Sequence, residues 1–276
     1  MKKKLPLVKL FIIILLLIWT LFPVYWMVSL SIRNADELRS SIPLFPKSFT
    51  LTHFVRLFTE RGFGLATMNS LQVTLISVFI SLILGLGVAY VLSRRRLHLK
   101  TSGFLSFWVF IIRVLPPIAF AIPLYLMMTN ARLIQTKVPI ISAHVLINLT
   151  FVIWFMITFF RALPIEMEES AMLDGATEWQ ILTRIVLPLV MPGVASVSIL
   201  SFMTSWNEYL YGVIFVQKPS NFTIPLILAT MNSEQELAEY GLIAAGGIIS
   251  LLPVLLFVIF AQKYLISGLS SGAVKE

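Results

Sequence analysis

The sequence predicts an all-α integral membrane protein with six transmembrane helices. Of its 276 residues (31.2 kDa), 58% are hydrophobic and 12% are charged, and the mean hydropathy is +0.91. Soluble domains carry about 25% charged residues, so these values exclude a water-soluble globule. A helix needs roughly 20 apolar residues to cross a hydrocarbon core of about 30 Å. Six windows meet this requirement: residues 10–30, 68–93, 104–128, 138–160, 187–216 and 241–265.

The first window could also be a signal sequence, and the fifth is longer than a straight span. The first follows Lys2 to Lys4, as a secretory signal core also would, but it exceeds the roughly 7 to 15 residues of such a core. No small-residue cleavage site follows it, so we predict a retained first span. The fifth window is too long for one straight span, and Pro188 and Pro192 predict a bend at its cytoplasmic end.

Charge fixes the expected orientation. The net charge is +8 and the pI about 9.8, but the basic residues flank apolar runs instead of forming the solvated face that a nucleic-acid binder needs. With a cytoplasmic amino terminus, the clusters Lys2 to Lys4 and Arg94 to Arg96 fall on the same, cytoplasmic side. Six spans then place the carboxyl terminus there too. The absence of cysteine excludes a disulfide framework, a thiolate metal site and a cysteine nucleophile.

Small residues are arranged for close helix packing in two windows. In the second window they recur every four residues, at Ser77, Ser81, Gly85, Ala89 and Ser93. The sixth window carries a similar patch: Gly241, Ala244, Ala245, Gly246, Gly247 and Ser250. Such stripes let helix backbones approach closely in lipid, and we therefore predict a compact bundle.

Two ionisable residues, Arg113 and Glu208, lie inside the apolar windows. Each would cost about 2.5 to 3.5 kcal/mol at the centre of an inserted helix. On an ideal helix Ser198, Ser201, Ser205 and Glu208 share an arc of roughly 80°, whereas Asn207 points elsewhere. Two interpretations remain open. The polar face borders a hydrated path for a hydroxyl-rich solute, or it forms an interhelical hydrogen-bond seam or an ion pair between Glu208 and Arg113.

The candidate solute-path residues are therefore Arg113, Ser198, Ser201, Ser205, Asn207 and Glu208. In the third window Pro116, Pro117 and Pro123 would leave backbone carbonyls without partners, which is tolerated beside a cavity or a partner helix.

The loop between the fourth and fifth windows, residues 161–187, predicts a helix, a glycine turn and a second helix. Pro164 suits a first helical position, and three glutamates follow it, where they meet the positive end of the helix dipole. Gly175 can adopt the left-handed conformation that ends a helix. Thr177 and Gln180 have the spacing of a capping box. This projection is suited to docking in a groove of another protein.

The same loop resembles the signature loop of the permease subunits of bacterial ABC importers. The matching pattern is Glu169-Ser-Ala171, three residues, Gly175, nine residues, Ile185, one residue, then Leu187-Pro188, with Ser170 in place of the usual alanine. Four other segments are similar to the carbohydrate branch, specifically the shorter six-span subunit of the maltose type. They are Asn69-Ser70, Tyr90-Val-Leu-Ser-Arg94, Trp206-Asn-Glu-Tyr-Leu210 and the tail from Gly268 to Lys275.

The resemblance implies a type I importer permease (MetI-like) fold in the bacterial inner membrane and a transport function without catalysis. A cytoplasmic ATPase dimer would use ATP and Mg, a homologous second permease would complete the path, and an extracytoplasmic binding protein would deliver the solute. This chain has no Walker-type phosphate loop, so we expect it to bind no cofactor. The implied ATPase-docking residues are Glu168, Glu169, Ala171, Asp174, Gly175, Ser270, Gly272 and Lys275.

We expect two regions: the first span with its outer segment (1–67), and a five-span core (68–276) that carries the docking loop. The outer segments 31–67 and 217–240 are either seats for the binding protein or ordinary solvated loops. Within the ABC class the cargo could instead be polyamine, phosphate or another solute.

Two other classes compete with the ABC permease. An intramembrane enzyme is disfavoured because His53, His98 and His144 form no His-Glu-x-x-His motif. An ion-coupled secondary transporter would use Glu208 or Arg113 as its coupling site, but we find no inverted repeat, and the signature loop would then have no purpose.

Overall fold

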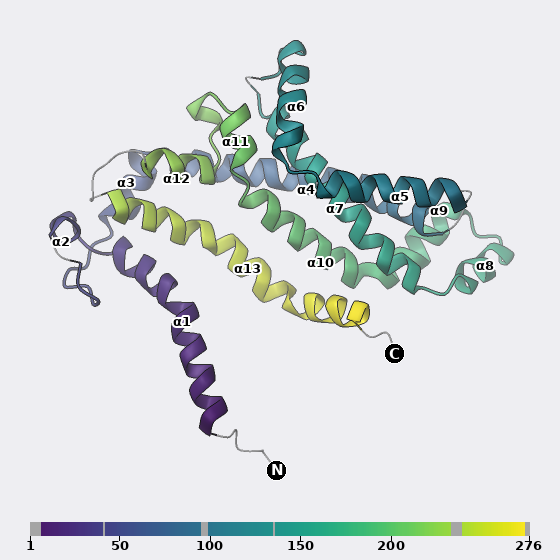
Figure 1. Cartoon of the computed structure of the whole chain (residues 1–276), viewed down its shortest axis with the longest axis horizontal. Coiled ribbons are helices and arrows are strands. Elements are labelled where there is room, and N and C mark those ends of the chain that lie inside the picture. The colour runs from purple at the N-terminus through teal and green to yellow at the C-terminus, as the bar shows by residue number, and fades with distance from the viewer. Residues whose placement is uncertain (1–6, 41, 95–98, 135, 233–238, 274–276) are drawn as a thin grey trace. The chain divides into compact units, whose positions relative to one another are not determined.

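The computed structural model describes residues 7–40, 42–94, 99–134, 136–232 and 239–273, except for the side chains of 99–102, 232, 239 and 260–273. All secondary structure in these ranges is helical, which confirms the all-α class (Figure 1). The elements are α1 (Leu7–Ser31), α2 (Ala35–Arg39), α3 (Thr52–Thr59), α4 (Phe63–Ser93), α5 (Leu99–Val114), α6 (Ile118–Asn130), α7 (Val138–Ala162), α8 (Glu166–Leu173), α9 (Glu178–Gln180), the π-helix η1 (Ile181–Val186), α10 (Leu187–Trp206), α11 (Leu210–Phe215), the 3₁₀ helix η2 (Pro219–Asn221), α12 (Ile224–Asn232) and α13 (Glu239–Ala273).

In the described residues, five helical segments are long and apolar enough to cross a membrane, and a bent helix pair adds a sixth if it counts as one span. The five are Leu7–Ser31, Phe63–Ser93, Val138–Ala162, Glu178–Trp206 and Tyr240–Ile259. Four of them match predicted windows closely, because a sustained apolar run of this length has few structural alternatives. The segment Glu178–Trp206 only overlaps the fifth window, since it begins within the predicted loop and ends ten residues before residue 216.

The third predicted window is the bent pair. Its two halves, Gly103–Val114 and Ile118–Asn130, meet at an angle of 95°. The bend falls at Pro116 and Pro117, which lack amide hydrogens and disfavour a helical conformation in the residue before each. Pro123 lies inside α6. The third window is thus not one straight span.

No break separates the helical segment at the prolines of the fifth window, so a bend there stays a prediction. Pro188 follows the π-helix η1 at the start of α10 and Pro192 lies in the interior of α10, and the candidate span Glu178–Trp206 runs through both. The interruption occurs at the other end, at residues 207–209 between α10 and α11.

The chain divides into two compact units: Met1–Ala66 with Leu226–Leu252, and Thr67–Pro225 with Pro253–Glu276. In the first unit the segment after α1 is organised by Arg33, whose side chain is fully buried. Its guanidinium donates to Glu37 at 2.9 Å and to Ser29 at 2.7 Å, and lies 5.6 Å from the Trp26 ring. A buried cation with an acid and an aromatic face beside it is well compensated.

The carboxylate of Glu37 ties α2 to the chain that follows. It accepts hydrogen bonds from the Ser48 hydroxyl and from the amides of Lys47 and Ser48. These hydrogen bonds, the Ser48 hydroxyl foremost, together with the charge of Arg33, hold the pKa of Glu37 below its ordinary value. The segment between α1 and α3 is therefore ordered by polar contacts more than by a hydrophobic core.

The small patch of the sixth window is also used for packing. A Cβ atom at Gly246 would lie 2.5 Å from the Leu228 side chain, and one at Gly247 would lie 2.9 Å from the Met27 sulfur. At Gly241 a Cβ atom would collide with the ring of His53, whose Nε2 donates to the Arg33 carbonyl at 2.8 Å. The predicted close packing is confirmed at these three glycines.

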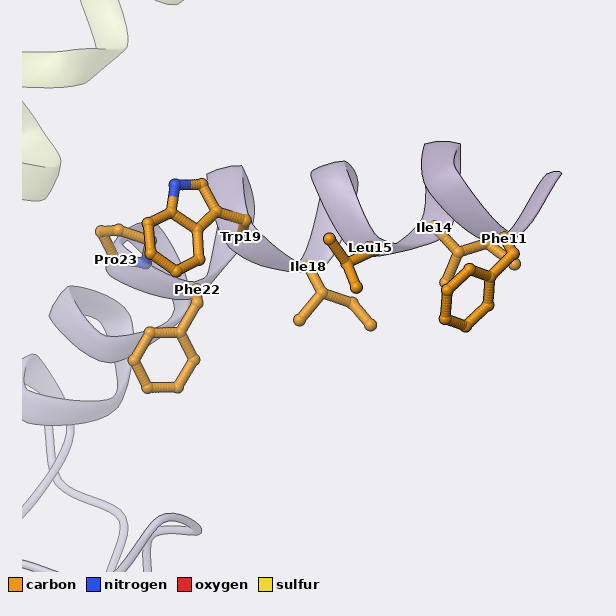
Figure 2. Close-up of a pocket in the computed structure, with 7 residues that line it drawn as sticks. All are labelled: Phe11, Ile14, Leu15, Ile18, Trp19, Phe22 and Pro23. Atoms are coloured by element: carbon orange, nitrogen blue, oxygen red, sulfur yellow. The ribbon is translucent and has the colours of Figure 1, made fainter. Parts of the chain in front are cut away.

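Helix α1 presents an apolar surface. Its membrane window is 0% buried, and a hollow of about 680 Å³ on it is lined by side chains of α1 from Phe11 to Pro23 (Figure 2). A hollow lined by one helix is a surface groove, and its aliphatic and aromatic walls suit lipid chains or an apolar partner helix better than a hydrophilic solute.

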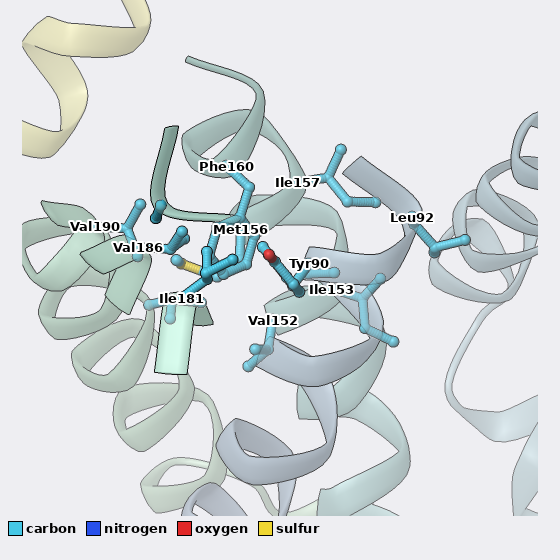
Figure 3. Close-up of a cluster of buried hydrophobic side chains, with 13 residues drawn as sticks. Tyr90, Leu92, Val152, Ile153, Met156, Ile157, Phe160, Ile181, Val186 and Val190 are labelled. Atoms are coloured by element: carbon cyan, nitrogen blue, oxygen red, sulfur yellow. The ribbon is translucent and has the colours of Figure 1, made fainter. Parts of the chain in front are cut away.

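The core of the second unit is a cluster from α4, α7, η1 and α10 (Figure 3). Its fully buried members include Val152, Met156 and Phe160 of α7 and Ile181 of η1. Helix α7 contacts α5, α6, α10 and α11, so it is the helix around which this unit packs.

The four-residue stripe of α4 packs against α7, as predicted. The Ser77 hydroxyl donates to the Val73 carbonyl of its own helix at 2.6 Å and lies 3.4 Å from the Ile141 carbonyl of α7, and the Ser81 hydroxyl donates to the Val145 carbonyl of α7 at 3.4 Å. A Cβ atom at Gly85 would lie 2.6 Å from the Val152 side chain. The stripe thus permits a backbone separation that larger residues would prevent.

A glycine pair in α4 tests this packing. Gly85→Ala places a methyl group against Val152, and overpacking of this kind costs about 1–3 kcal/mol. Gly87→Ala is the matched control, because nothing lies within 4 Å of its Cβ position and alanine favours the helix. We expect Gly85→Ala to lower the thermal unfolding midpoint of the purified protein and Gly87→Ala to leave it equal or higher. Equal midpoints for the two variants would contradict the packing argument.

Candidate functional site

The docking loop has the predicted helix, glycine turn and second helix. Helix α8 ends in a turn in which the Gly175 amide donates to the Met172 carbonyl and the Ala176 amide to the Ala171 carbonyl, both at 3.0 Å. Gly175 has φ +82°. These two bonds with a left-handed residue define a Schellman motif, which satisfies the last carbonyls of α8.

The second helix begins with the predicted capping box. The Gln180 amide donates to the Thr177 hydroxyl at 3.3 Å, and the Gln180 side chain accepts from the Thr177 amide at 2.8 Å. Helix α9 is short and continues through η1 into α10. The loop is therefore joined without a break to the span that follows it.

The two neighbouring glutamates of α8 point in different directions. Glu169 is exposed, whereas Glu168 is only 2% exposed. The Glu168 carboxylate lies 2.6 Å from Nε of Arg94 and accepts from the Tyr90 hydroxyl at 2.7 Å. Glu168 was predicted to dock the ATPase, but the structure places it inside, because positions 168 and 171 share the helix face that packs on the core.

The remaining predicted docking residues fall into three groups. Asp174 and Gly175 are exposed beside Leu173, which is 90% exposed, whereas Ala171 is buried in the hydrophobic core. Ser270 and Gly272 belong to α13, in a part whose side chains lie outside the described residues. Lys275 also lies outside the described residues. The outward surface of the loop thus combines two carboxylates, Glu169 and Asp174, with an apolar side chain.

The polar face of the fifth window lies against α7. Ser205 accepts a hydrogen bond from the Asn148 side chain at 2.7 Å, and Ser201 is fully buried. The Ser198 hydroxyl donates to the Val194 carbonyl of its own helix. At Ser205 the interhelical seam is therefore the interpretation that the structure favours.

Glu208 is not on the face of α10, because the helix ends at Trp206. Its carboxylate lies 3.1 Å from Nε2 of His144 and accepts from the Tyr211 amide at 2.9 Å. Asn207 is exposed, and its side chain donates back to the Met203 carbonyl. The break after α10 thus turns the carboxylate toward α7.

Arg113 does not pair with Glu208. Its guanidinium lies 4.6 Å from the centre of the Phe151 ring and 5.1 Å from that of Trp154, both on α7. It also lines a hollow of about 60 Å³ with Thr150. A cation over two aromatic faces is partly compensated by their quadrupoles, but it keeps the capacity to bind an anion or a hydroxyl.

The two backbone irregularities of this unit are joined directly. The Tyr211 hydroxyl, in α11 after the break of the fifth window, donates at 2.7 Å to the carbonyl of Pro117, at the bend of the third. Among the described residues, no group of three or more His, Asp or Glu side chains is placed to hold a metal ion. The arrangement provides hydrogen bonds and mechanical links, and it contains no arrangement typical of a catalytic centre.

Comparison with known proteins identifies the family. Residues 77–271 match the family described as "binding-protein-dependent transport system inner membrane component". The chain belongs to this family. It is 34% identical over 264 residues to the inner membrane ABC transporter permease protein YcjP of Escherichia coli K12, covering 95% of this chain and 93% of that one. It is 30% identical over 263 residues to the diacetylchitobiose uptake system permease protein DasC of Streptomyces coelicolor, covering 95% and 94%.

Solved structures agree on the permease fold. The chain superposes with a TM-score of 0.79 on a chain of a bacterial ABC transporter that imports the acidic polysaccharide alginate, at 20% identity and covering 93% of this chain and 95% of that one. A structure of the alginate transporter with an alginate pentasaccharide-bound periplasmic protein gives 0.68, at 20% identity and 92% coverage of both chains. The permease is thus a multi-pass, non-catalytic inner-membrane component of a binding-protein-dependent ABC importer.

Four residues that matter in this permease were not found by sequence reasoning. Tyr90 was used only as part of a similar segment, Arg94 only there and in the basic cluster that predicts orientation, and His144 only as a residue outside any metal motif. Asn148 was not noticed at all. His144 and Asn148 lie four residues apart in an apolar window, and a polar pair with that spacing is the signal that could have found them.

Substitution of Gly175 tests the turn. A β-branched residue resists positive φ, and nothing lies within 4 Å of the Cβ position, so backbone strain alone is at issue. We expect Gly175→Val to uncouple or disassemble the transporter while its spans remain inserted, and Gly175→Asn to be much milder, because asparagine tolerates this conformation. Uptake and co-purification of the ATPase are the measurements. Normal values of both for Gly175→Val would contradict the prediction.

Proposed function

We propose that this permease forms half of a heterodimeric path for a sugar or oligosaccharide, as the shorter maltose-type subunit. Two of the similar proteins support this cargo. DasC belongs to a diacetylchitobiose uptake system, and the superposed chain belongs to an importer of alginate. The observation that carries the coupling role is the outward surface of α8, where Glu169, Leu173 and Asp174 are exposed next to the Gly175 turn.

In this proposal the surface of α8 docks in a cleft of a cytoplasmic ATPase dimer. An exposed leucine between carboxylates suits a groove with an apolar floor and basic rim. The tail residues Ser270, Gly272 and Lys275 add contacts to the same ATPase. ATP and Mg are bound and used by the ATPase, and closure of its dimer moves the loop and the spans joined to it.

The orientation follows from the docking role. The loop 161–187 lies in the cytoplasm, and so do both termini. The outer segments 31–67 and 217–240 then face the solute-binding protein. Within the first segment, the Arg33–Glu37 ion pair (2.9 Å) and its hydrogen bonds provide a preformed surface, which reduces the ordering cost of binding. We assign the outer segment 31–67 to a first region (1–67) and the docking loop to a five-span core (68–276).

The solute path is assigned to the groups that retain hydrogen-bonding capacity. Arg113 and Asn207 are exposed on the isolated subunit, and Glu208 is partly exposed. Ser198 has intermediate exposure and Ser201 is buried, whereas Ser205 is bonded to Asn148 of α7. A polyol solute suits this set, because it offers both donors and acceptors.

The experiment is purification of the permease from its native membrane with its partners, followed by reconstitution into vesicles. We expect a co-purifying ATPase, a second permease, and uptake that requires both ATP and the binding protein. A panel of mono- and oligosaccharides, a polyamine and phosphate, tested for binding to the binding protein, identifies the cargo. Uptake by this chain alone under a proton gradient would overturn the proposal, and preference for polyamine or phosphate would overturn its sugar part.

Substitution of Glu208 separates transport from docking. We expect Glu208→Ala to reduce uptake by about tenfold, the effect of about 1.4 kcal/mol for a lost charged hydrogen bond, while the ATPase still co-purifies. Thr204→Ala is the control, because Thr204 lies one turn earlier, is exposed and bonds only within its own helix. Loss of assembly in Glu208→Ala, without a separable effect on uptake, would show that the carboxylate serves packing alone.

A further inference from the structure

The buried face of α8 carries an ion pair that takes no part in the exposed docking surface of the same helix. The Glu168 carboxylate has two partners inside the protein: Oε1 lies 2.6 Å from Nε of Arg94, an ion pair without hydrogen-bond geometry, and Oε2 accepts from the Tyr90 hydroxyl at 2.7 Å. The three residues are 2%, 6% and 5% exposed. We call Glu168, Arg94 and Tyr90 the α4–α8 clasp.

The clasp joins the end of α4 to α8 and to the end of α7, which directly precedes α8 in the chain. Tyr90 lies in the last turns of α4, and Arg94 follows the end of that helix. Arg94 also donates from Nη1 to the carbonyl of Leu163, the residue that caps α7, at 3.2 Å. The ring of Tyr90 packs edge-on against Phe160 of α7, with 5.7 Å between ring centres. The carboxylate of α8 is therefore held by the end of α4, and the same two α4-side residues also contact the end of α7.

A contact of this kind transmits displacement differently from apolar packing. Apolar side chains can slide past one another with small changes in energy, whereas a buried carboxylate that loses its cation is left as an uncompensated charge. The hydrogen bond from Tyr90 is directional and fixes the rotation of α8 as well as its position. Movement of α8 away from the end of α4 is therefore costly, and the two elements move together.

We propose that the α4–α8 clasp is the link through which movement of the docking helix reaches α4, so that Glu168, Arg94 and Tyr90 are positioning residues for energy coupling. This rests on the proposed function, in which an ATPase moves α8. The docking surface receives the movement, and the clasp prevents α8 from moving without the span. In a transporter whose clasp is broken, the ATPase therefore continues to hydrolyse ATP but little solute is transported.

The test uses the complete transporter with its binding protein, in vesicles where ATP hydrolysis and uptake are both measured. Glu168→Gln keeps the shape of the side chain but removes its charge, and Arg94→Gln removes the cation. We expect each to leave the ATPase bound and hydrolysing ATP while uptake per ATP falls by about tenfold, within the usual range of coupling effects. The double variant should be no worse than either single one, because one link is lost in each case.

Two further variants control for structural damage. Glu166→Gln removes a charge from an exposed position of the same helix turn and should leave uptake per ATP unchanged. Tyr90→Phe keeps the ring against Phe160 and loses only the hydroxyl, so we expect a smaller loss of uptake per ATP, about two- to fivefold, in a complex that assembles normally.

A covalent link provides the decisive measurement. The chain has no cysteine, so Arg94→Cys with Glu168→Cys introduces the two thiols of this subunit. Bridging them with a short reversible thiol reagent should restore uptake per ATP, and reduction should abolish it again. Unchanged uptake per ATP in the assembled Gln variants, multiplicative losses in the double variant, or failure of Tyr90→Phe to assemble would overturn the clasp. An unmodified complex without ATP-driven uptake would instead overturn the proposed function on which the clasp rests.

Discussion

The second unit depends on one constraint: within a span, a polar group must find its partner in the protein, because the lipid offers none. The serines of α4 meet it with backbone carbonyls: Ser77 donates to Val73 of its own helix at 2.6 Å and lies 3.4 Å from the Ile141 carbonyl of α7, and Ser81 donates to the Val145 carbonyl of α7. The side chains that do so are small, so the same residues that satisfy the hydrogen bonds also allow the close approach. Helix α7 contributes to the contacts of α4, α5 and α10, and its polar side chain Asn148 bonds across to the last of these.

The same constraint accounts for where the spans are broken. At the 95° bend of the third span, the Pro117 carbonyl accepts the Phe120 amide at 3.2 Å and also the hydroxyl of Tyr211 at 2.7 Å. Tyr211 is positioned by the break of the fifth span, whose carboxylate Glu208 accepts the Tyr211 amide and lies beside His144. The two irregularities are thus joined by a hydrogen bond inside the protein. Non-helical backbone is tolerated here because protein, and not lipid, surrounds it.

The sequence was sufficient where the structure is local or periodic, and insufficient where it is decided by distant contacts. The six apolar windows, the small-residue stripe of α4 and the Gly175 turn follow from residue spacing alone. The opposite orientations of Glu168 and Glu169 do not, because they depend on the position of Tyr90, 78 residues earlier. The His144–Glu208 contact spans 64 residues and was equally hidden. The π-helix η1 directly before Pro188 was hidden too, because none of these residue spacings predicts its wider turns.

The orientations of these two glutamates divide the work of α8. A buried carboxylate paired with a cation and hydrogen-bonded to Tyr90 is not accessible to an external partner, so Glu168 serves the subunit to which it belongs. Glu169 and Asp174 remain at the surface with Leu173, whose 90% exposure is unfavourable for an apolar side chain in water. A helix that is rigidly attached on one face and incompletely covered on the other can take up a load at a surface and deliver it to a span. Glu168 and Glu169 are the same residue type but have opposite roles. Contact with Tyr90 and Arg94 at the end of α4 distinguishes the buried Glu168 from the exposed Glu169.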